Sequence, residues 1–493
     1  QVTRIGRAAF KECPALSRVT FAEGSKMQTI GVQAFFNCDA LASIQLPEGL
    51  VYIENGAFNN CSKLSAIDIP ASVLSVGESA FYECSDLSKV TLHNGTQTIG
   101  REAFCTCWNL SSVTLPESLV SMGSQAFIGC SSLTSVVIPK NIKTIEPGTF
   151  RSCSSLTNIV LPDSLVTIGE SAFQGCGMSQ IRIPDNVSVF GSSAFSECVN
   201  LTSVAIPKSM AHIANSAFYG CSNMTSVTIP EGVTTIGANA FHLCNLLSLS
   251  LPQSLTTIAG GGSYRGAFAD NKNLSVVVIP DNVTSIGYEA FSGCTSLKTI
   301  VFGANVTTLD RGVLRGCTSL TEVSLPKKLT IIPNSCFLGC PALSKVILPE
   351  GLTTIEGYAF QDCSSLQTIQ LPSTIRVMTQ AFAGCTGLVE IEIPEGVSIL
   401  DNTFIDCPNL SKVTLPSSLT TIGTQAFYHC SNLVSLHIPS GVTNIGSSAF
   451  RDCIALSNIV LPSGLTTLGD CAFQDCRALS KIVLPNKLTS VPT

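Results

Sequence analysis

Side chains able to do acid–base or nucleophilic chemistry are few in this chain and lie far apart. The five histidines, His93, His212, His242, His429 and His437, fall in different segments, and none belongs to a recognisable serine or cysteine nucleophile motif. Residues 260–262 are glycines, but no Lys-Ser/Thr pair follows them as it does in a phosphate-binding loop. We therefore predict that the protein is not an enzyme and that it has no cofactor or catalytic site.

Cysteine is the one reactive residue type that recurs in a regular pattern. Twenty of the 23 cysteines, from Cys13 to Cys476, are spaced about 23 residues apart, and Asn271 replaces the one that is missing. Neighbouring members of the series could come within disulfide range, but a small buried hydrophobe would also recur in this way. Because the total is odd and disulfide stapling is typical of small domains, we favour buried free thiols. Cys105, Cys336 and Cys471 are too dispersed to predict a metal site.

A phenylalanine three residues before almost every one of these cysteines marks the repeated element that must position them. The series runs through Phe10, Phe35, Phe58, Phe81, Phe104, Phe127, Phe150, Phe173, Phe195, Phe218, Phe241, Phe268, Phe291, Phe337, Phe360, Phe382, Phe404, Phe427, Phe450 and Phe473. Leu314 fills the one gap, so we count 21 repeats. A fixed period of about 20–50 residues indicates a solenoid in which each unit packs on its neighbours.

One repeat, Leu110 to Cys130, shows what each unit contains. Alternation at Val113 and Leu115 predicts a short strand with both side chains pointing inward. A proline follows at position 116 and ends the strand, because proline has no N–H for the ladder. The apolar residues Leu119 and Met122, a glycine turn, and the pair Ala126-Phe127 complete the unit on its far side.

The pattern L-x-x-I-x-I-P followed by I-G-x-x-A-F-x-x-C resembles the BspA-like, or Treponema-type, leucine-rich repeat. Clear copies lie at residues 227–244 and 433–453, and the resemblance covers residues 2–490. It implies a right-handed, curved and mostly β solenoid with a parallel strand ladder and short irregular segments on the opposite side. The family resemblance also implies a protein on the surface of bacteria or parasitic protists, where such proteins adhere to host proteins or other cells.

Length and charge limit the number of domains that the chain can have and the kinds of partner that it can bind. The period crosses all 493 residues without a linker, so we predict a single repeat domain over 1–493. Both ends fall within a repeat, which leads us to expect a fragment of a longer chain. The net charge of −6 and the scattered Lys and Arg residues form no basic stripe, which argues against nucleic-acid binding. No apolar run reaches the roughly 18 residues that a membrane span needs.

The candidate binding surface is the outward face of the predicted strands. Its apolar members are Val278, Val301 and Ile347. Glu322 and Lys345 lie beside them, at the strand position two residues earlier in the repeat. An exposed apolar strip next to charged residues is found at many protein contacts. An insertion at residues 259–266 brings Tyr264 and Arg265, two residue types common at interface hot spots, near this strip. Both features also have a purely structural explanation. The apolar residues can be β-branched residues that pack along a strand ladder, and the insertion can be one that is tolerated at a corner of the solenoid.

We expect a non-enzymatic module that binds a protein of a host or of another cell through its strand face, located at the cell surface or secreted. Two alternatives stay open. A cytoplasmic protein-interaction scaffold would suit reduced cysteines, and a passive stalk that displays another domain would suit the incomplete ends.

Overall fold

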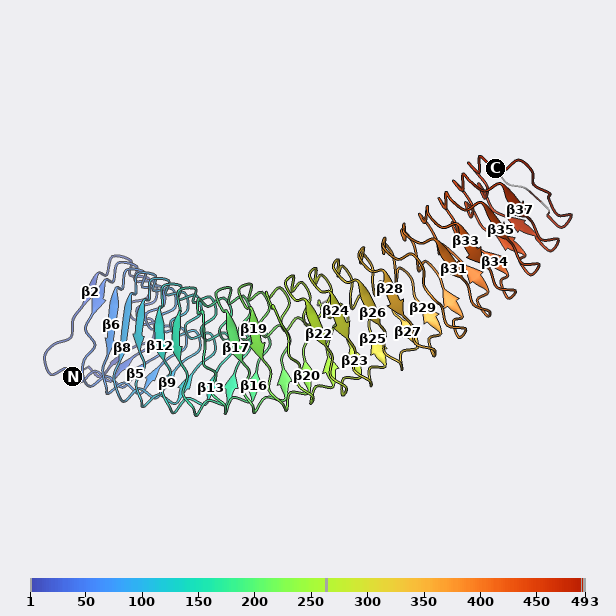
Figure 1. Cartoon of the computed structure of the whole chain (residues 1–493). Coiled ribbons are helices and arrows are strands. Elements are labelled where there is room, and N and C mark those ends of the chain that lie inside the picture. The colour runs from blue at the N-terminus through green and yellow to red at the C-terminus, as the bar shows by residue number, and fades with distance from the viewer. Residues whose placement is uncertain (1, 262–264, 489, 491–493) are drawn as a thin grey trace. The chain divides into compact units, whose positions relative to one another are not determined.

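Most repeats contribute two short strands and a turn segment, which recur in the same order along the chain (Figure 1). The computed structural model describes residues 2–261, 265–488 and 490. Within these ranges the structure contains 38 strands and no helix. The chain is therefore a parallel β-solenoid. Its contacts divide it into unit 1, Gln1–Asn245, and unit 2, Leu246–Thr493.

The first strand of a repeat precedes the proline position. In unit 1 the first strands are β2 (Arg18–Val19), β4 (Ser43–Ile44), β6 (Ala66–Ile69), β8 (Lys89–Leu92), β10 (Ser112–Thr114), β12 (Ser135–Val137), β14 (Asn158–Val160), β17 (Ser203–Ala205) and β19 (Ser226–Thr228). In unit 2 they are β22 (Val276–Val278), β24 (Thr299–Val301), β26 (Glu322–Ser324), β28 (Lys345–Ile347), β31 (Glu390–Glu392), β33 (Lys412–Thr414), β35 (Ser435–His437) and β37 (Asn458–Val460).

The second strand lies between the proline position and the turn segment. In unit 1 the second strands are β1 (Arg4–Ile5), β3 (Thr29–Ile30), β5 (Tyr52–Ile53), β7 (Ser75–Val76), β9 (Thr98–Ile99), β11 (Ser121–Met122), β13 (Thr144–Ile145), β15 (Thr167–Ile168), β16 (Val189–Phe190), β18 (His212–Ile213) and β20 (Thr235–Ile236). In unit 2 they are β21 (Thr257–Ile258), β23 (Ser285–Ile286), β25 (Thr308–Leu309), β27 (Ile331–Ile332), β29 (Thr354–Ile355), β30 (Val377–Met378), β32 (Ile399–Leu400), β34 (Thr421–Ile422), β36 (Asn444–Ile445) and β38 (Thr467–Leu468).

Strands of the same kind in successive repeats pair with each other in parallel. In β10, for example, Val113 lies opposite Val90 of β8, and in β11 Met122 lies opposite Ile99 of β9. The alternation at Val113 therefore predicts the first strand correctly. The sequence pattern does not predict the second strand, because two residues are too few to display alternation.

Proline favours the end of the first strand, as one of the three repeats that lack it illustrates. His93 occupies the proline position after β8, and its N–H donates to the carbonyl of Ile69 at 3.2 Å. Both β6 and β8 reach four residues there, whereas most other first strands have three. Proline cannot donate such a bond, although β24 also has only three residues before Gly303, so proline is not the sole limit on strand length.

The turn segment forms a third ladder that contains no strand. The N–H groups of Gln33, Phe35 and Asn37 donate to the carbonyls of Asn55, Ala57 and Asn59 in the next repeat, at 2.8–2.9 Å. Gln33 and Asn37 adopt φ values of 54° and 57°, which bring alternate N–H groups into line with the axis of stacking. Left-handed residues at both positions recur along the chain, where polar residues and glycine tolerate them best.

Phenylalanine rings fill the interior behind these turns. In unit 1 the rings stack without interruption from Phe10 to Phe241 with centroids 5.2–5.7 Å apart. Offset stacking at this spacing contributes about 0.5–1.5 kcal/mol per pair beyond the burial of apolar area. One repeat has only one ring, so this energy exists only between neighbours, as expected for a solenoid.

Candidate protein-contact surface

The first-strand face of unit 2 carries the predicted apolar residues in exposed positions. Val278 of β22 and Val301 of β24 are register partners, 55% and 50% exposed respectively. Between them and the core lie Val277 and Ile300, which are buried, so the outward assignment of the two valines is correct. Val276, which the prediction omitted, lies on the same strand and is 49% exposed.

The charged members of the prediction lie on the next pair of strands. Glu322 of β26 and Lys345 of β28 are register partners, and their carboxylate and ammonium groups are 3.8 Å apart. Ile347 lies opposite Ser324 on the same two strands and is exposed. Because β24 and β26 belong to successive repeats in contact with each other, the structure places all five residues on one strip. We call Val278, Val301, Glu322, Lys345 and Ile347 the unit 2 strip.

Arg265 has a role within the fold that the sequence pattern does not predict. Its guanidinium lies 2.8 Å from the carboxylate of Glu289, whose side chain is only 4% exposed, and Arg315 reaches the other carboxylate oxygen at 3.4 Å. A nearly buried carboxylate needs such partners, because an uncompensated charge would be costly. Arg265 therefore ties the inserted segment to the next repeat. Tyr264 lies outside the described residues.

The same face is hollowed elsewhere into grooves. One of about 640 Å³ in unit 2 is bordered by Gln370, Glu390, Glu392, Glu395 and Lys412. Backbone N–H donation from Ser417 lowers the pKa of the Glu395 carboxyl. A second groove of about 510 Å³ in unit 1 is lined by residues of β4, β6 and β8. None of the unit 2 strip residues lines either groove.

Some exposed apolar residues were not part of the predicted site. Trp108, the only tryptophan in the chain, is 54% exposed and follows Cys107 at the start of a first-strand segment. Val137, Val160 and Val460 are exposed on the first-strand face of other repeats. Trp108 could have been singled out from the sequence, because every other repeat has a smaller residue at the position that follows the cysteine.

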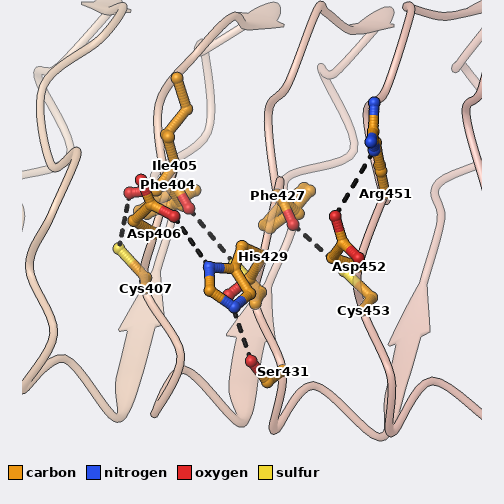
Figure 2. Close-up of polar contacts among 11 residues, drawn as sticks. Phe404, Ile405, Asp406, Cys407, Phe427, His429, Ser431, Arg451, Asp452 and Cys453 are labelled. Carbon is orange, nitrogen blue, oxygen red and sulfur yellow. Dashed lines mark hydrogen bonds and ion pairs between the residues drawn. The ribbon is translucent and has the colours of Figure 1, made fainter. Parts of the chain in front are cut away.

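One histidine lies close to an aspartate and a serine, but the geometry is not that of a catalytic triad. His429 Nδ1 lies 2.9 Å from Asp406 Oδ1 (Figure 2). The hydroxyl of Ser431 donates to the backbone carbonyl of His429 at 3.5 Å, and not to its ring. A nucleophilic serine would need a ring nitrogen as its base. This contact therefore joins neighbouring turns and activates no nucleophile.

We call the twenty regularly spaced cysteines from Cys13 to Cys476 the column cysteines. They are free thiols, and all except Cys13 are buried. Each buried thiol donates to the carbonyl of the phenylalanine position in the preceding repeat, as Cys61 does to Phe35 at 3.1 Å. Burial raises the pKa of Cys153 to about 12, although donation from the neighbouring backbone lowers it in part. Such thiols are poor nucleophiles and poor metal ligands, because both roles require the thiolate.

Asn271, which replaces one cysteine of the 23-residue series, makes hydrogen bonds of its own to the backbone. The segment between Cys244 and Pro252 is one residue shorter than in a regular repeat, and the described residues 247–250 form no strand. Asn271 Oδ1 accepts from the N–H of Leu246 at 3.1 Å, and its Nδ2 donates to the carbonyl of Phe268 at 2.9 Å. An amide can therefore serve a backbone group that a thiol could not.

Two further properties bear on the partner. Over the ranges that the structure describes, no cluster of three His, Cys, Asp or Glu side chains has the arrangement of a metal site. The described residues also contain no helix long and apolar enough to cross a membrane.

Comparison with known proteins identifies the repeat. A family model described as the BspA type leucine rich repeat region matches in six copies, at residues 3–104, 75–201, 143–264, 190–318, 262–389 and 376–493. No protein with a curated description matches the chain in sequence.

Solved structures with similar folds come from several bacteria. A leucine-rich repeat protein from Bacteroides ovatus is 24% identical, with 86% of this chain and 91% of the other covered and a TM-score of 0.48. A leucine rich cell surface protein from Faecalibacterium prausnitzii is 23% identical, with 90% and 92% covered and a TM-score of 0.38. The leucine rich repeat protein of T. pallidum is 27% identical, with 41% and 82% covered and a TM-score of 0.31.

Proposed function

The chain belongs to the BspA-type leucine-rich repeat family, and from this premise we propose that it is a non-enzymatic protein-binding module that acts at the cell surface or after secretion. Its partner is a protein of a host or of another cell. The observation that carries the proposal is the unit 2 strip, where Val278, Val301 and Ile347 are each at least half exposed on a rigid ladder.

The chemistry of the strip fits a protein partner. Its valine and isoleucine side chains gain from burial at about 25 cal/mol per Å² of apolar surface. Glu322 and Lys345 lie beside them, 64% exposed each, and can pair with opposite charges at the rim of an interface. Backbone pairing of β22 with β24 and of β26 with β28 holds these side chains in place, so little conformational entropy is lost on binding.

The test uses two matched double variants of the full chain. Val301→Asp with Ile347→Asp places charges on the strip, whereas Val377→Asp with Ile399→Asp places them on exposed residues of second strands in the same unit. Fluorescently labelled proteins are incubated with intact cultured cells and with cells whose surface proteins have been removed by protease. We expect the wild type and the second variant to bind intact cells only, and the first variant to lose binding.

Circular dichroism confirms that both variants keep the strand content of the wild type. Equal binding by both variants would contradict the role of the strip, and binding that survives protease treatment would contradict a protein partner. Location is tested by labelling intact cells of the source organism with an antibody against this chain, before and after permeabilisation.

A cytoplasmic scaffold is the second candidate, and the free column thiols favour it. Disulfides are common in exported proteins and rare in the cytoplasm. Antibody labelling only after permeabilisation would support this alternative.

A further inference from the structure

The chain contains two asparagine–glycine pairs, Asn55-Gly56 and Asn94-Gly95, and both lie in unit 1. In such a pair the backbone nitrogen of the glycine can attack the side-chain carbonyl carbon of the asparagine, because glycine has no Cβ to block the approach. The reacting atoms belong to residues that are joined in the chain. The fold therefore decides only whether the glycine N–H is free to react.

Gly56 is a buried member of the turn ladder. Its N–H donates to the backbone carbonyl of Glu78 at 2.8 Å, next to the bond from Phe58 to Ala80. Ala57 and Phe58, which follow Gly56 directly, are fully buried in the core. The N–H of Gly56 can be freed only if the turn opens and the packing of the phenylalanine stack is disturbed with it.

Gly95 lies instead at the corner between β8 and β9, where it is half-buried. Its N–H donates to the side-chain hydroxyl of Ser118 at 2.9 Å, and this hydroxyl donates to the carbonyl of Thr96 at 2.8 Å. The N–H of Gly95 is therefore held by a single side chain and not by a backbone ladder.

Two departures from the repeat pattern weaken the corner that carries Gly95. His93 replaces the proline, and Thr96 replaces the apolar residue that Leu119 supplies in the next repeat. Proline restricts the unfolded chain, and a buried leucine removes more apolar surface from water than a threonine does. Both changes lower the free energy that opens the corner locally. We therefore expect the N–H of Gly95 to be free more often than that of Gly56.

The side-chain carbonyls of the two asparagines are activated in the same way. The N–H of Glu117 donates to Asn94 Oδ1 at 3.1 Å, and the N–H of Glu78 donates to Asn55 Oδ1 at 3.0 Å. A donor at this oxygen stabilises the negative charge that develops on it when the carbonyl carbon is attacked. The two pairs therefore differ in how the glycine N–H is held and not in the carbonyl.

We propose that Asn94 is a site of spontaneous conversion to isoaspartate, from which the turn ladder protects Asn55. The Gly95 nitrogen loses its proton to water and bonds to Cγ of Asn94, and the side-chain amide leaves as ammonia. Water then opens the cyclic imide at one of its two carbonyl carbons, which gives isoaspartate or aspartate. In sum, one asparagine and one water give one carboxylic acid and one ammonia, and no oxidant or reductant takes part.

Isoaspartate changes the corner because its main chain is one methylene longer. Gly95 has a φ of 143° and packs so closely that a Cβ there would overlap the carbonyl of Ala71, so the longer chain cannot keep its place. The product also adds a negative charge next to His93, whose ring lies 2.8 Å from Asp68 in the groove of unit 1. The reaction thus alters the border of this groove in aged molecules, independently of the unit 2 strip.

The experiment incubates the folded full-length protein at mildly alkaline pH in water labelled with heavy oxygen. Peptide mass spectrometry follows both pairs over time, and methylation by isoaspartyl methyltransferase identifies isoaspartate. We expect Asn94 to convert at least about tenfold faster than Asn55, which corresponds to about 1.4 kcal/mol of additional opening free energy at Gly56. In urea, where both turns are unfolded, the two rates should become similar.

Two matched variants test the bond that restrains Gly95. Ser118→Ala removes the acceptor of its N–H and should speed the reaction at Asn94 by about threefold to tenfold, the factor expected for the loss of one hydrogen bond. Ser111→Ala removes a hydroxyl that bonds elsewhere in unit 1, to the carbonyl of Ser88, and should leave the rate unchanged. Circular dichroism confirms that both variants are folded.

Three results would overturn the proposal. They are the absence of isoaspartate at Asn94, equal rates at Asn55 and Asn94 in the folded protein, and a rate in the folded Ser118→Ala variant that does not exceed that of the wild type. Because unit 2 strip residues are unchanged in every arm, none of these results depends on partner binding.

Discussion

Alkaline pH should unfold this protein through its buried cysteine column. The column thiols are neutral in the folded state, because burial opposes formation of the thiolate. Burial raises the pKa from an ordinary value of 9.0 to about 12 for six of them, namely Cys153, Cys198, Cys244, Cys294, Cys340 and Cys407. A raised folded pKa means that the stabilisation is complete below the unfolded pKa and is lost as pH rises toward the folded one.

The expected size of this loss follows from linkage. At about pH 10, one unit above the ordinary thiol pKa, each such thiol lowers the free energy of unfolding by about 1.4 kcal/mol. Three of the six lie in each unit, so each unit loses about 4 kcal/mol from these three alone. This is a large share of the roughly 5–15 kcal/mol that stabilises a typical domain.

The assay is urea denaturation followed by circular dichroism at several values between about pH 8 and pH 11, with a reductant present. Thiolate absorbance in the ultraviolet reports deprotonation in the same samples. The matched variant carries Cys153→Ala, Cys198→Ala and Cys244→Ala, and its stability should fall less steeply, by about 4 kcal/mol per pH unit. Stability that stays constant from pH 9 to pH 11, or equal slopes for the two proteins, would refute the reasoning that the thiols are buried and neutral.

Two other substitutions test single contacts. Arg265→Ala should destabilise unit 2 by about 1–2 kcal/mol, because the nearly buried carboxylate of Glu289 loses a charge-assisted hydrogen bond of 2.8 Å. Arg311→Ala, in an exposed position of the same unit, is the control for urea denaturation, and equal effects would mean that the ion pair adds nothing. Cys221→Ser should cost about 1 kcal/mol in the same assay, because the buried hydroxyl can still donate to the carbonyl of Phe195. A loss above about 3 kcal/mol would mean that the serine hydroxyl finds no acceptor.

The sequence predicted the elements whose signal repeats within a strand or between repeats. Val113 and Val227 alternate with polar neighbours, and proline marks where their strands end, so the first ladder could be read directly. The second ladder could not, because a strand such as Ser121–Met122 has two residues and resembles a turn. The turn ladder was also beyond prediction, since its bonds depend on left-handed φ values at residues as ordinary as Gln33.

For the candidate site, the sequence pattern predicted which side chains point outward but not which of them hold the fold together. Exposure of Val301 and Ile347 followed from strand alternation and is confirmed. Arg265 was predicted as a contact residue from its type and its place in an insertion, whereas its ion pair with Glu289 depends on how the next repeat folds. Binding by the unit 2 strip stays a prediction, as do the single domain over residues 1–493 and the location.

The three ladders impose a rule on how the gene for such a protein can change length. The axial hydrogen bonds join the same two positions in each pair of successive repeats, as the N–H of Phe35 with the carbonyl of Ala57 and that of Phe58 with Ala80. Unequal crossing-over between two repeats removes or adds a whole turn, and each ladder then closes on an equivalent partner. Loss of one codon can instead cost a strand, as at residues 180–183 behind the short segment after Cys176, where the described chain has none, although β31 and β32 both form in the 22-residue repeat between Phe382 and Phe404. Recombination between repeats therefore disrupts the backbone hydrogen bonding of the solenoid less than small deletions do.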